Sequence, residues 1–105
     1  MRRVVVTGLG MLTPLGNGVD VNWKRLISGQ SGIRKISDFD VSDISCKIAG
    51  QIPQKIDDPE AGLDIDQWIE PRDQKRIDRF IAYGIISAMQ AVEDSGWKPK
   101  NDEEK

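Results

Sequence analysis

The sequence contains one cysteine, Cys46, and no histidine. A cysteine becomes a nucleophile when a histidine, a cation or a helix N-terminus stabilises its thiolate. Cys46 lies in a stretch that we interpret as a strand, so a buried structural role is the favoured interpretation. The absence of histidine also excludes His-based acid–base catalysis and most zinc sites. We therefore expect no catalytic residue, no metal site and no cofactor in this chain.

Two other sequence patterns could indicate a ligand site, but the support for each of them is weak. Gly8-Leu9-Gly10 follows an apolar run, as in a dinucleotide-binding turn, but that turn needs a third glycine at position 13 and a helix starting there. Thr13 and Pro14 occupy this place, so a strand-ending turn is favoured over a small free-standing nucleotide-binding domain. The acidic residues from Asp57 to Asp66 lack the spacing of a calcium loop and predict a solvated loop.

Four cations between residues 72 and 79 form the strongest candidate for a binding site. Arg72, Lys75, Arg76 and Arg79 follow the spacing i, i+3, i+4 and i+7, which would place them on one face of a helix. A solvated face balanced by nearby aspartates is the ordinary interpretation of such a cluster. The alternative is a docking site for an acidic partner.

The elements that position these residues are few. Val4–Val6 predicts a strand covered on both faces, as in a parallel sheet between helices. A helix should follow, capped by Asn17 or Asp20 and ended by Gly29; its apolar residues are Val21, Trp23, Leu26 and Ile27. Alternation from Cys46 to Ile52 predicts a short strand that ends at Pro53.

The longest predicted helix extends from Pro71 to Ser95, with Gly96 as a left-handed cap. Its first turns are charged, whereas the part from Phe80 to Val92 is apolar around most of its circumference. Such a helix is normally buried on several sides. One further strand and one short helix supply too little cover, and they cannot complete a parallel sheet.

We therefore expect an α/β fold that forms the opening part of a larger protein: one to two strands and two helices of an incomplete α-β-α layered domain. Residues 1–105 should form one partial domain without an internal boundary, and residues 98–105 a polar tail. Whether the chain is a gene fragment, a split gene product or a truncated protein is left open by the residues.

The composition limits which classes of binding partner and which cellular compartment we expect for this chain. The chain has 105 residues, 38% hydrophobic and 30% charged, with a net charge of −2. This composition is globular, and the charge gives no global field for nucleic acid or an anionic membrane surface. No window is long and apolar enough for a membrane helix, and one cysteine allows no internal disulfide. We expect a cytoplasmic chain without nucleic-acid or membrane partners.

Several motifs spread over nearly the whole chain form one recognisable set. They are the segments Arg2-Arg3-Val4-Val5-Val6-Thr7-Gly8-Leu9-Gly10-Met11-Leu12-Thr13-Pro14-Leu15-Gly16-Asn17, Trp23-Lys24-Arg25-Leu26, Gly29-Gln30-Ser31-Gly32-Ile33, Phe39-Asp40, Ala49-Gly50, Asp73-Gln74-Lys75-Arg76-Ile77-Asp78-Arg79-Phe80, Ala82-Tyr83-Gly84 and Asp94-Ser95-Gly96-Trp97. Together these segments resemble the β-ketoacyl-[acyl-carrier-protein] synthase II family of bacterial condensing enzymes, which have the thiolase fold.

This resemblance implies fatty-acid elongation by decarboxylative Claisen condensation of an acyl thioester with malonyl-carrier. The family uses one cysteine and two histidines for this reaction, and none of them is present here, so this chain alone should be inactive. The alternative is a non-catalytic piece of a split or decayed synthase that binds the carrier or pairs with another subunit.

The resemblance also implies partners. In the family, a basic patch receives the acidic acyl carrier protein, and its positions match Arg72, Lys75 and Arg76; Arg79 has no such assignment. Complementary charge would speed and orient this encounter. The other expected partner is the missing remainder of the synthase, or further copies in a homo-oligomer.

Overall fold

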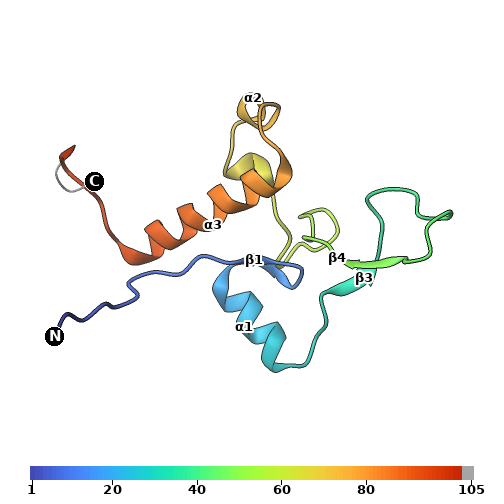
Figure 1. The fold of residues 1–105 in the computed structure, drawn as a ribbon, viewed down its shortest axis with the longest axis horizontal. Coiled ribbons are helices and arrows are strands. Elements are labelled where there is room, and N and C mark those ends of the chain that lie inside the picture. Colours follow the sequence, from blue (N-terminus) through green and yellow to red (C-terminus); the bar gives the residue numbers. More distant parts are fainter. Residues whose placement is uncertain (103–105) are drawn as a thin grey trace.

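The computed structural model describes residues 1–102, and Figure 1 shows their arrangement. The elements are β1 (Leu12–Thr13), β2 (Gly16–Asn17), α1 (Val19–Ile27), β3 (Ile33–Lys35), β4 (Ile48–Gly50), the 3-10 helix η1 (Ile65–Gln67), α2 (Pro71–Gln74) and α3 (Arg79–Ser95). The predicted polar tail is irregular from residue 98 to 101, and residues 103–105 lie outside the described part.

The strands form two small antiparallel pairs. β1 pairs with β2, with Leu12 opposite Asn17, and β3 pairs with β4, with Ile33 opposite Gly50. The strand predicted from Cys46 to Ile52 is therefore shorter, and its partner β3 is not among the strands predicted from the sequence. This second pair projects as an arm from the rest of the molecule (Figure 1).

Residues 4–6, predicted as a strand, are assigned to no strand in the structure. These residues are largely exposed, with 96% for Val4 and 73% for Val5. A strand needs a neighbour for its backbone hydrogen bonds, and within residues 1–102 no other strand lies beside this segment. The expectation that these valines need neighbouring strands from elsewhere agrees with this exposure.

The following residues are held against α3, beneath which the N-terminal segment extends (Figure 1). The Leu9 amide donates to Asp94 Oδ2 at 3.0 Å, and the Met11 amide donates to Gln90 Oε1 at 3.0 Å. A Cβ atom on Gly10 would lie 1.8 Å from the Ser87 carbonyl oxygen. The glycines of the Gly8-Leu9-Gly10 motif thus allow close backbone packing, and they do not precede the N-terminus of a helix.

Helix α1 ends as predicted, because Gly29 has a φ of 80° and its amide bonds the Leu26 carbonyl oxygen. Its start differs from the prediction. The N-cap is Gly18, with no side-chain capping bond, so neither Asn17 nor Asp20 caps the helix. The apolar residues of α1 are also poorly covered, with Trp23 62% exposed.

The predicted continuous helix from Pro71 to Ser95 is wrong, since residues 75–78 separate α2 from α3. Asp78 has an extended backbone, with a φ of −75° and a ψ of 161°, and it precedes α3 as its N-cap. Ile77 packs against the buried core just before this point. Burial of Ile77 offers the physical reason for the break. Gly96 ends α3 in the left-handed conformation, as predicted.

The buried core is small and lies under the start of α3. It consists of Leu63, Ile69, Ala82 and Ile86. Several apolar residues of α3 outside this core are exposed, with 72% for Phe80 and 48% for Val92. This exposure agrees with the expectation that the Phe80–Val92 region needs more cover than this chain supplies. No helix within residues 1–102 is long and apolar enough to span a membrane.

Candidate functional site

The three predicted docking cations lie together on α2 and the turn that follows it. Arg72 belongs to α2, whereas Lys75 and Arg76 occupy the turn, and all three are exposed. The prediction that they share one helical face with Arg79 is wrong, because the helix is interrupted between them. Arg79 instead pairs with Asp38, with 3.3 Å between Nη1 and Oδ2.

The charges of this turn are largely unpaired. Arg72 Nε lies 4.0 Å from Asp73 Oδ1, and in the described part of the chain neither Lys75 nor Arg76 has an ion pair. Surface cations in this state keep their field directed into solvent, where it acts on an approaching anion. Residues 70–79 carry four cations and three carboxylates, so their net positive charge is small and local.

Helix α2 is only four residues long, and contacts outside it hold it in place. Gln74 Nε2 donates to Asp66 Oδ1 and to the Ile69 carbonyl oxygen, each at 2.7 Å. The Asp73 and Gln74 amides donate to the Glu70 carbonyl oxygen. Sequence reasoning missed Gln74 because its partners lie outside the predicted helix.

A groove with a volume of about 520 Å³ adjoins these cations. Trp68, Ile69, Ile77 and Ile85 provide its apolar lining, and Glu70, Asp73 and Arg76 provide its charged lining. We call this feature the Arg76 groove. Ile69 is buried, whereas Ile85 is 40% exposed. The groove is therefore a largely apolar hollow whose charged lining consists of two carboxylates and one guanidinium.

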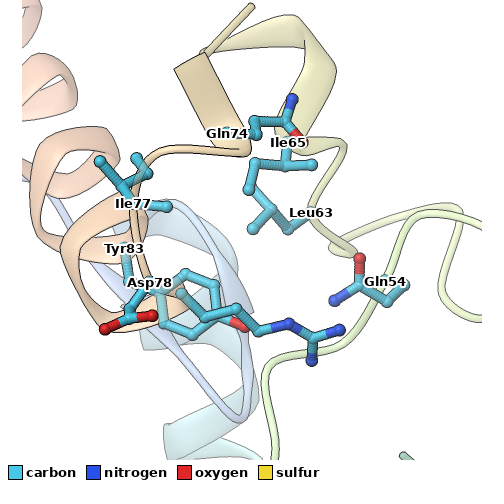
Figure 2. A pocket seen from close by; sticks show the side chains of 9 residues that line it. Gln54, Leu63, Ile65, Gln74, Ile77, Asp78 and Tyr83 are labelled. Carbon is cyan, nitrogen blue, oxygen red and sulfur yellow. The ribbon is translucent and has the colours of Figure 1, made fainter. Parts of the chain in front are cut away.

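A second, smaller hollow of about 230 Å³ lies between α3 and the loops that precede it. Figure 2 shows that Leu63 and Ile65 line it between Gln54 on one side and Ile77 and Tyr83 on the other. Its lining includes one acid, Asp78, but no cysteine and no histidine. This hollow has no activated nucleophile, and its wall is continuous with the core.

Cys46 is exposed, so the prediction of a buried structural cysteine is wrong. It lies two residues before β4, in the exposed connection of the β3–β4 arm, where no core is present to cover it. In the described part of the chain, the Cys46 thiol has one hydrogen-bond partner, the Ile48 carbonyl oxygen, at 3.4 Å from Sγ. The adjacent Lys47 donates from Nζ to the carbonyl oxygens of Val41, Ser42 and Ile44, and no hydrogen bond from it to the Cys46 thiol is present within residues 1–102.

The acidic loop also differs from its prediction, because Asp58 is not a solvated residue. Arg25 Nη1 and Nη2 donate to its two carboxylate oxygens at 2.6 and 3.2 Å, and both side chains are 17% exposed. These hydrogen bonds from Arg25 hold the pKa of Asp58 below its ordinary value. Arg25 Nη1 also donates to the Leu15 carbonyl oxygen, so this pair ties α1 to two loops and is structural.

Comparison with known proteins gives one family over the whole chain. Residues 1–105 match the family described as "Beta-ketoacyl synthase, N-terminal domain". The 3-oxoacyl-[acyl-carrier-protein] synthase 2 of Rhizobium meliloti (strain 1021) is 45% identical over 104 residues, which cover 99% of this chain and 24% of the relative. The enzyme of the same name from Vibrio cholerae is 46% identical over 95 residues, or 90% of this chain and 21% of the relative.

A solved structure has the same fold. "The ishigamide ketosynthase/chain length factor" superposes with a TM-score of 0.76 at 30% sequence identity, covering 92% of this chain and 22% of that one. The predicted α/β, thiolase-like fold class is confirmed by this likeness. The chain spans less than a quarter of the length of these relatives. It belongs to the β-ketoacyl synthase family, whose N-terminal domain it matches from its first residue to its last.

Proposed function

We propose that residues 1–105 provide the N-terminal part of a β-ketoacyl-[acyl-carrier-protein] synthase. The observation that carries this proposal is the 45% identity over 104 residues with a 3-oxoacyl-[acyl-carrier-protein] synthase 2. The reaction of the complete enzyme is the decarboxylative Claisen condensation of an acyl thioester with malonyl-carrier. An active-site cysteine holds the acyl group as a thioester, and loss of CO₂ from the malonyl group generates the carbanion that attacks it.

The contribution of this chain to the reaction is structural and not chemical. It has no histidine, and its one cysteine is exposed in a loop. Its exposed apolar surfaces, above all Val4–Val6 and the side of α3 with Phe80 and Val92, are places for further polypeptide to pack. The remainder of the synthase supplies that cover and the catalytic residues.

A segment exchange tests this proposal. Residues 1–105 replace the matching 104-residue segment of the Rhizobium meliloti relative. We expect the chimera to form ketoacyl product from acyl and malonyl thioesters at a rate within about tenfold of the parent enzyme. The 105-residue chain alone, and the parent without the segment, should form none. Product from the isolated chain, or a folded but inactive chimera, would contradict the proposal.

We also propose that Arg72, Lys75 and Arg76 dock the acidic acyl carrier protein. Their exposure and their scarcity of ion pairs support this role. Long-range attraction between an acidic protein and these cations would raise the association rate and orient a transient complex. A piece of a split synthase could use the same surface to bind the carrier without catalysis.

Charge reversal tests the docking surface. Arg76→Glu should weaken binding of the Rhizobium meliloti acyl carrier protein to the 105-residue chain by about tenfold at low salt, because attraction becomes repulsion. Binding is measured by isothermal titration calorimetry at several salt concentrations. Lys35→Glu is the matched control, since Lys35 is exposed on β3 in the projecting arm and the net charge changes equally. Equal effects of both variants would contradict a local docking site.

A further inference from the structure

The loop of residues 36–47 connects the two strands of the β3–β4 arm (Figure 1). Its ends meet, because the Ile36 amide donates to the Lys47 carbonyl oxygen at 2.8 Å. Residues 36–47 contain no strand or helix, so their backbone groups need partners other than a regular ladder. Most of the loop is exposed, but Val41 is 7% exposed. The loop is therefore folded onto itself, and one side chain supplies partners for its backbone.

That side chain is Lys47, whose ammonium group bonds three backbone oxygens of the loop. Its Nζ donates to the carbonyl oxygens of Val41 at 2.8 Å, Ser42 at 3.3 Å and Ile44 at 2.8 Å. An ammonium group has three N–H donors, so the three acceptors match its donors in number. Within residues 1–102, Lys47 forms no ion pair with a carboxylate. The partners that the structure gives this positive charge are backbone oxygens.

We propose that these three carbonyl oxygens form a binding site for a primary ammonium group, and that Lys47 fills this site from within the chain. Converging carbonyl oxygens carry partial negative charge and repel one another, and a cation bonded to all three removes this repulsion. Hydrogen bonds from a charged donor are also stronger than neutral ones. The loop accordingly keeps its shape only while the site is filled. The proposed site is independent of the synthase reaction.

The geometry of the site favours an ammonium over a guanidinium. The three oxygens meet at one nitrogen atom, as suits a compact charge with rotatable donors. A guanidinium spreads its donors over a rigid planar fork, which matches paired acceptors such as a carboxylate. Arginine at position 47 would therefore keep the charge and lose the fit.

The shape of the loop determines where Asp38 lies. The Ile44 amide donates to the Val41 carbonyl oxygen at 3.1 Å, so one oxygen of the ammonium site also closes a turn of the loop. Asp38 Oδ2 lies 3.3 Å from Nη1 of Arg79, the first residue of α3. An exposed ion pair contributes too little to order a loop by itself. We infer that the filled ammonium site orders the loop, and that the loop then brings Asp38 to α3.

Lys47→Ala empties the site, and amide hydrogen exchange of the 105-residue chain by NMR measures the result. The Ile44 amide should exchange at least about tenfold faster, because the turn loses three hydrogen bonds from the ammonium group. The Asn17 amide, which donates to the Ala61 carbonyl oxygen outside the arm, should keep its protection. Lys35→Ala is the matched control, since Lys35 is exposed on β3 in the same arm. It should change Ile44 exchange less than about twofold.

Added methylammonium chloride tests whether the empty site binds an ammonium group. It should restore Ile44 protection in Lys47→Ala and leave the unsubstituted chain unchanged. Tetramethylammonium chloride at the same concentration has the same charge but no N–H donor, so it should restore nothing. Lys47→Arg should exchange at Ile44 nearly as fast as Lys47→Ala.

The results divide clearly between support and contradiction. Unchanged Ile44 exchange in Lys47→Ala, or the same loss in Lys35→Ala, would overturn the site. So would a loss that methylammonium does not reverse, or one that both salts reverse equally, because the second result is screening and not binding. If Lys47→Ala unfolds and Asn17 loses protection too, recovery of both amides with methylammonium alone supports the site, and no recovery overturns it.

Discussion

Gly10→Ala is expected to release the N-terminal segment from α3. The new Cβ would lie 1.8 Å from the Ser87 carbonyl oxygen and 2.8 Å from the Ala91 amide nitrogen. Both atoms belong to the backbone of a regular helix, so they cannot move aside as the end of a flexible side chain can. Overpacking of this kind costs about 1–3 kcal/mol, and we expect a loss near the upper end.

Hydrogen exchange provides the direct measurement. The Leu9 and Met11 amides, which donate to Asp94 and Gln90, should lose protection about a hundredfold in Gly10→Ala, the equivalent of about 3 kcal/mol. The same substitution at Gly84 is the control. Gly84 lies within α3, and nothing lies within 4 Å of the position of its Cβ. Gly84→Ala should stabilise the helix by up to about 1 kcal/mol. Unchanged exchange at Leu9 and Met11 in Gly10→Ala would contradict the close packing.

The C-terminal ends of α1 and α3 could be predicted from the sequence because a local residue determines each of them. Gly29 and Gly96 both have positive φ angles, of 80° and 69°, where a helix ends. A positive φ angle is energetically unfavourable for residues that have a Cβ atom, and glycine avoids this penalty. A single glycine after an apolar run therefore predicts where the helix ends, and no tertiary contact is needed for this prediction.

The break between α2 and α3 could not be predicted in this way. Residues 71–95 have no glycine or proline at the break, and their charge spacing favours a continuous helix. At the interruption, Ile77 packs against a core to which residues on both sides of it contribute, Leu63 and Ile69 before it and Ala82 and Ile86 after it. A tertiary contact thus overrides a local preference.

For the candidate site, the sequence identified the exposed cations but not their arrangement. Arg72, Lys75 and Arg76 were recognised from their spacing and from family resemblance, yet the Arg76 groove depends on Trp68 and Ile85, which come from separate elements. The Arg25–Asp58 pair joins residues 33 positions apart. Such contacts follow from the folded path of the chain, which residue spacing alone does not specify.

Asn22 is a buried polar residue inside α1. Asparagine is unfavourable inside a helix because its amide competes for backbone groups, so its place between Val21 and Trp23 within α1 needs a reason. It is 3% exposed. Its Nδ2 donates to the carbonyl oxygens of Gly16, at 2.9 Å, and Gly18, at 2.6 Å.

Asn22→Leu is expected to destabilise the chain by about 2–4 kcal/mol. The Thr13 hydroxyl also donates to Asn22 Oδ1, so one amide joins α1 to both strands of the β1–β2 hairpin. Leucine has a similar size but no polar atoms, and it would leave the buried Gly16 carbonyl oxygen and the Thr13 hydroxyl without these partners. The free energy of unfolding, from urea titration followed by circular dichroism, measures the loss.

Lys24→Leu separates this effect from that of adding a leucine to α1. Lys24 lies two residues later on the same helix, its side chain is 76% exposed, and its ion pair with Glu60 is 3.6 Å long. A surface pair of this kind contributes less than about 1 kcal/mol, so Lys24→Leu should change stability little. If both variants lose the same free energy, the amide of Asn22 does not hold the hairpin. If only Asn22→Leu unfolds at a lower urea concentration, the turn before α1 depends on a side chain inside the helix, and not on a capping residue at its start.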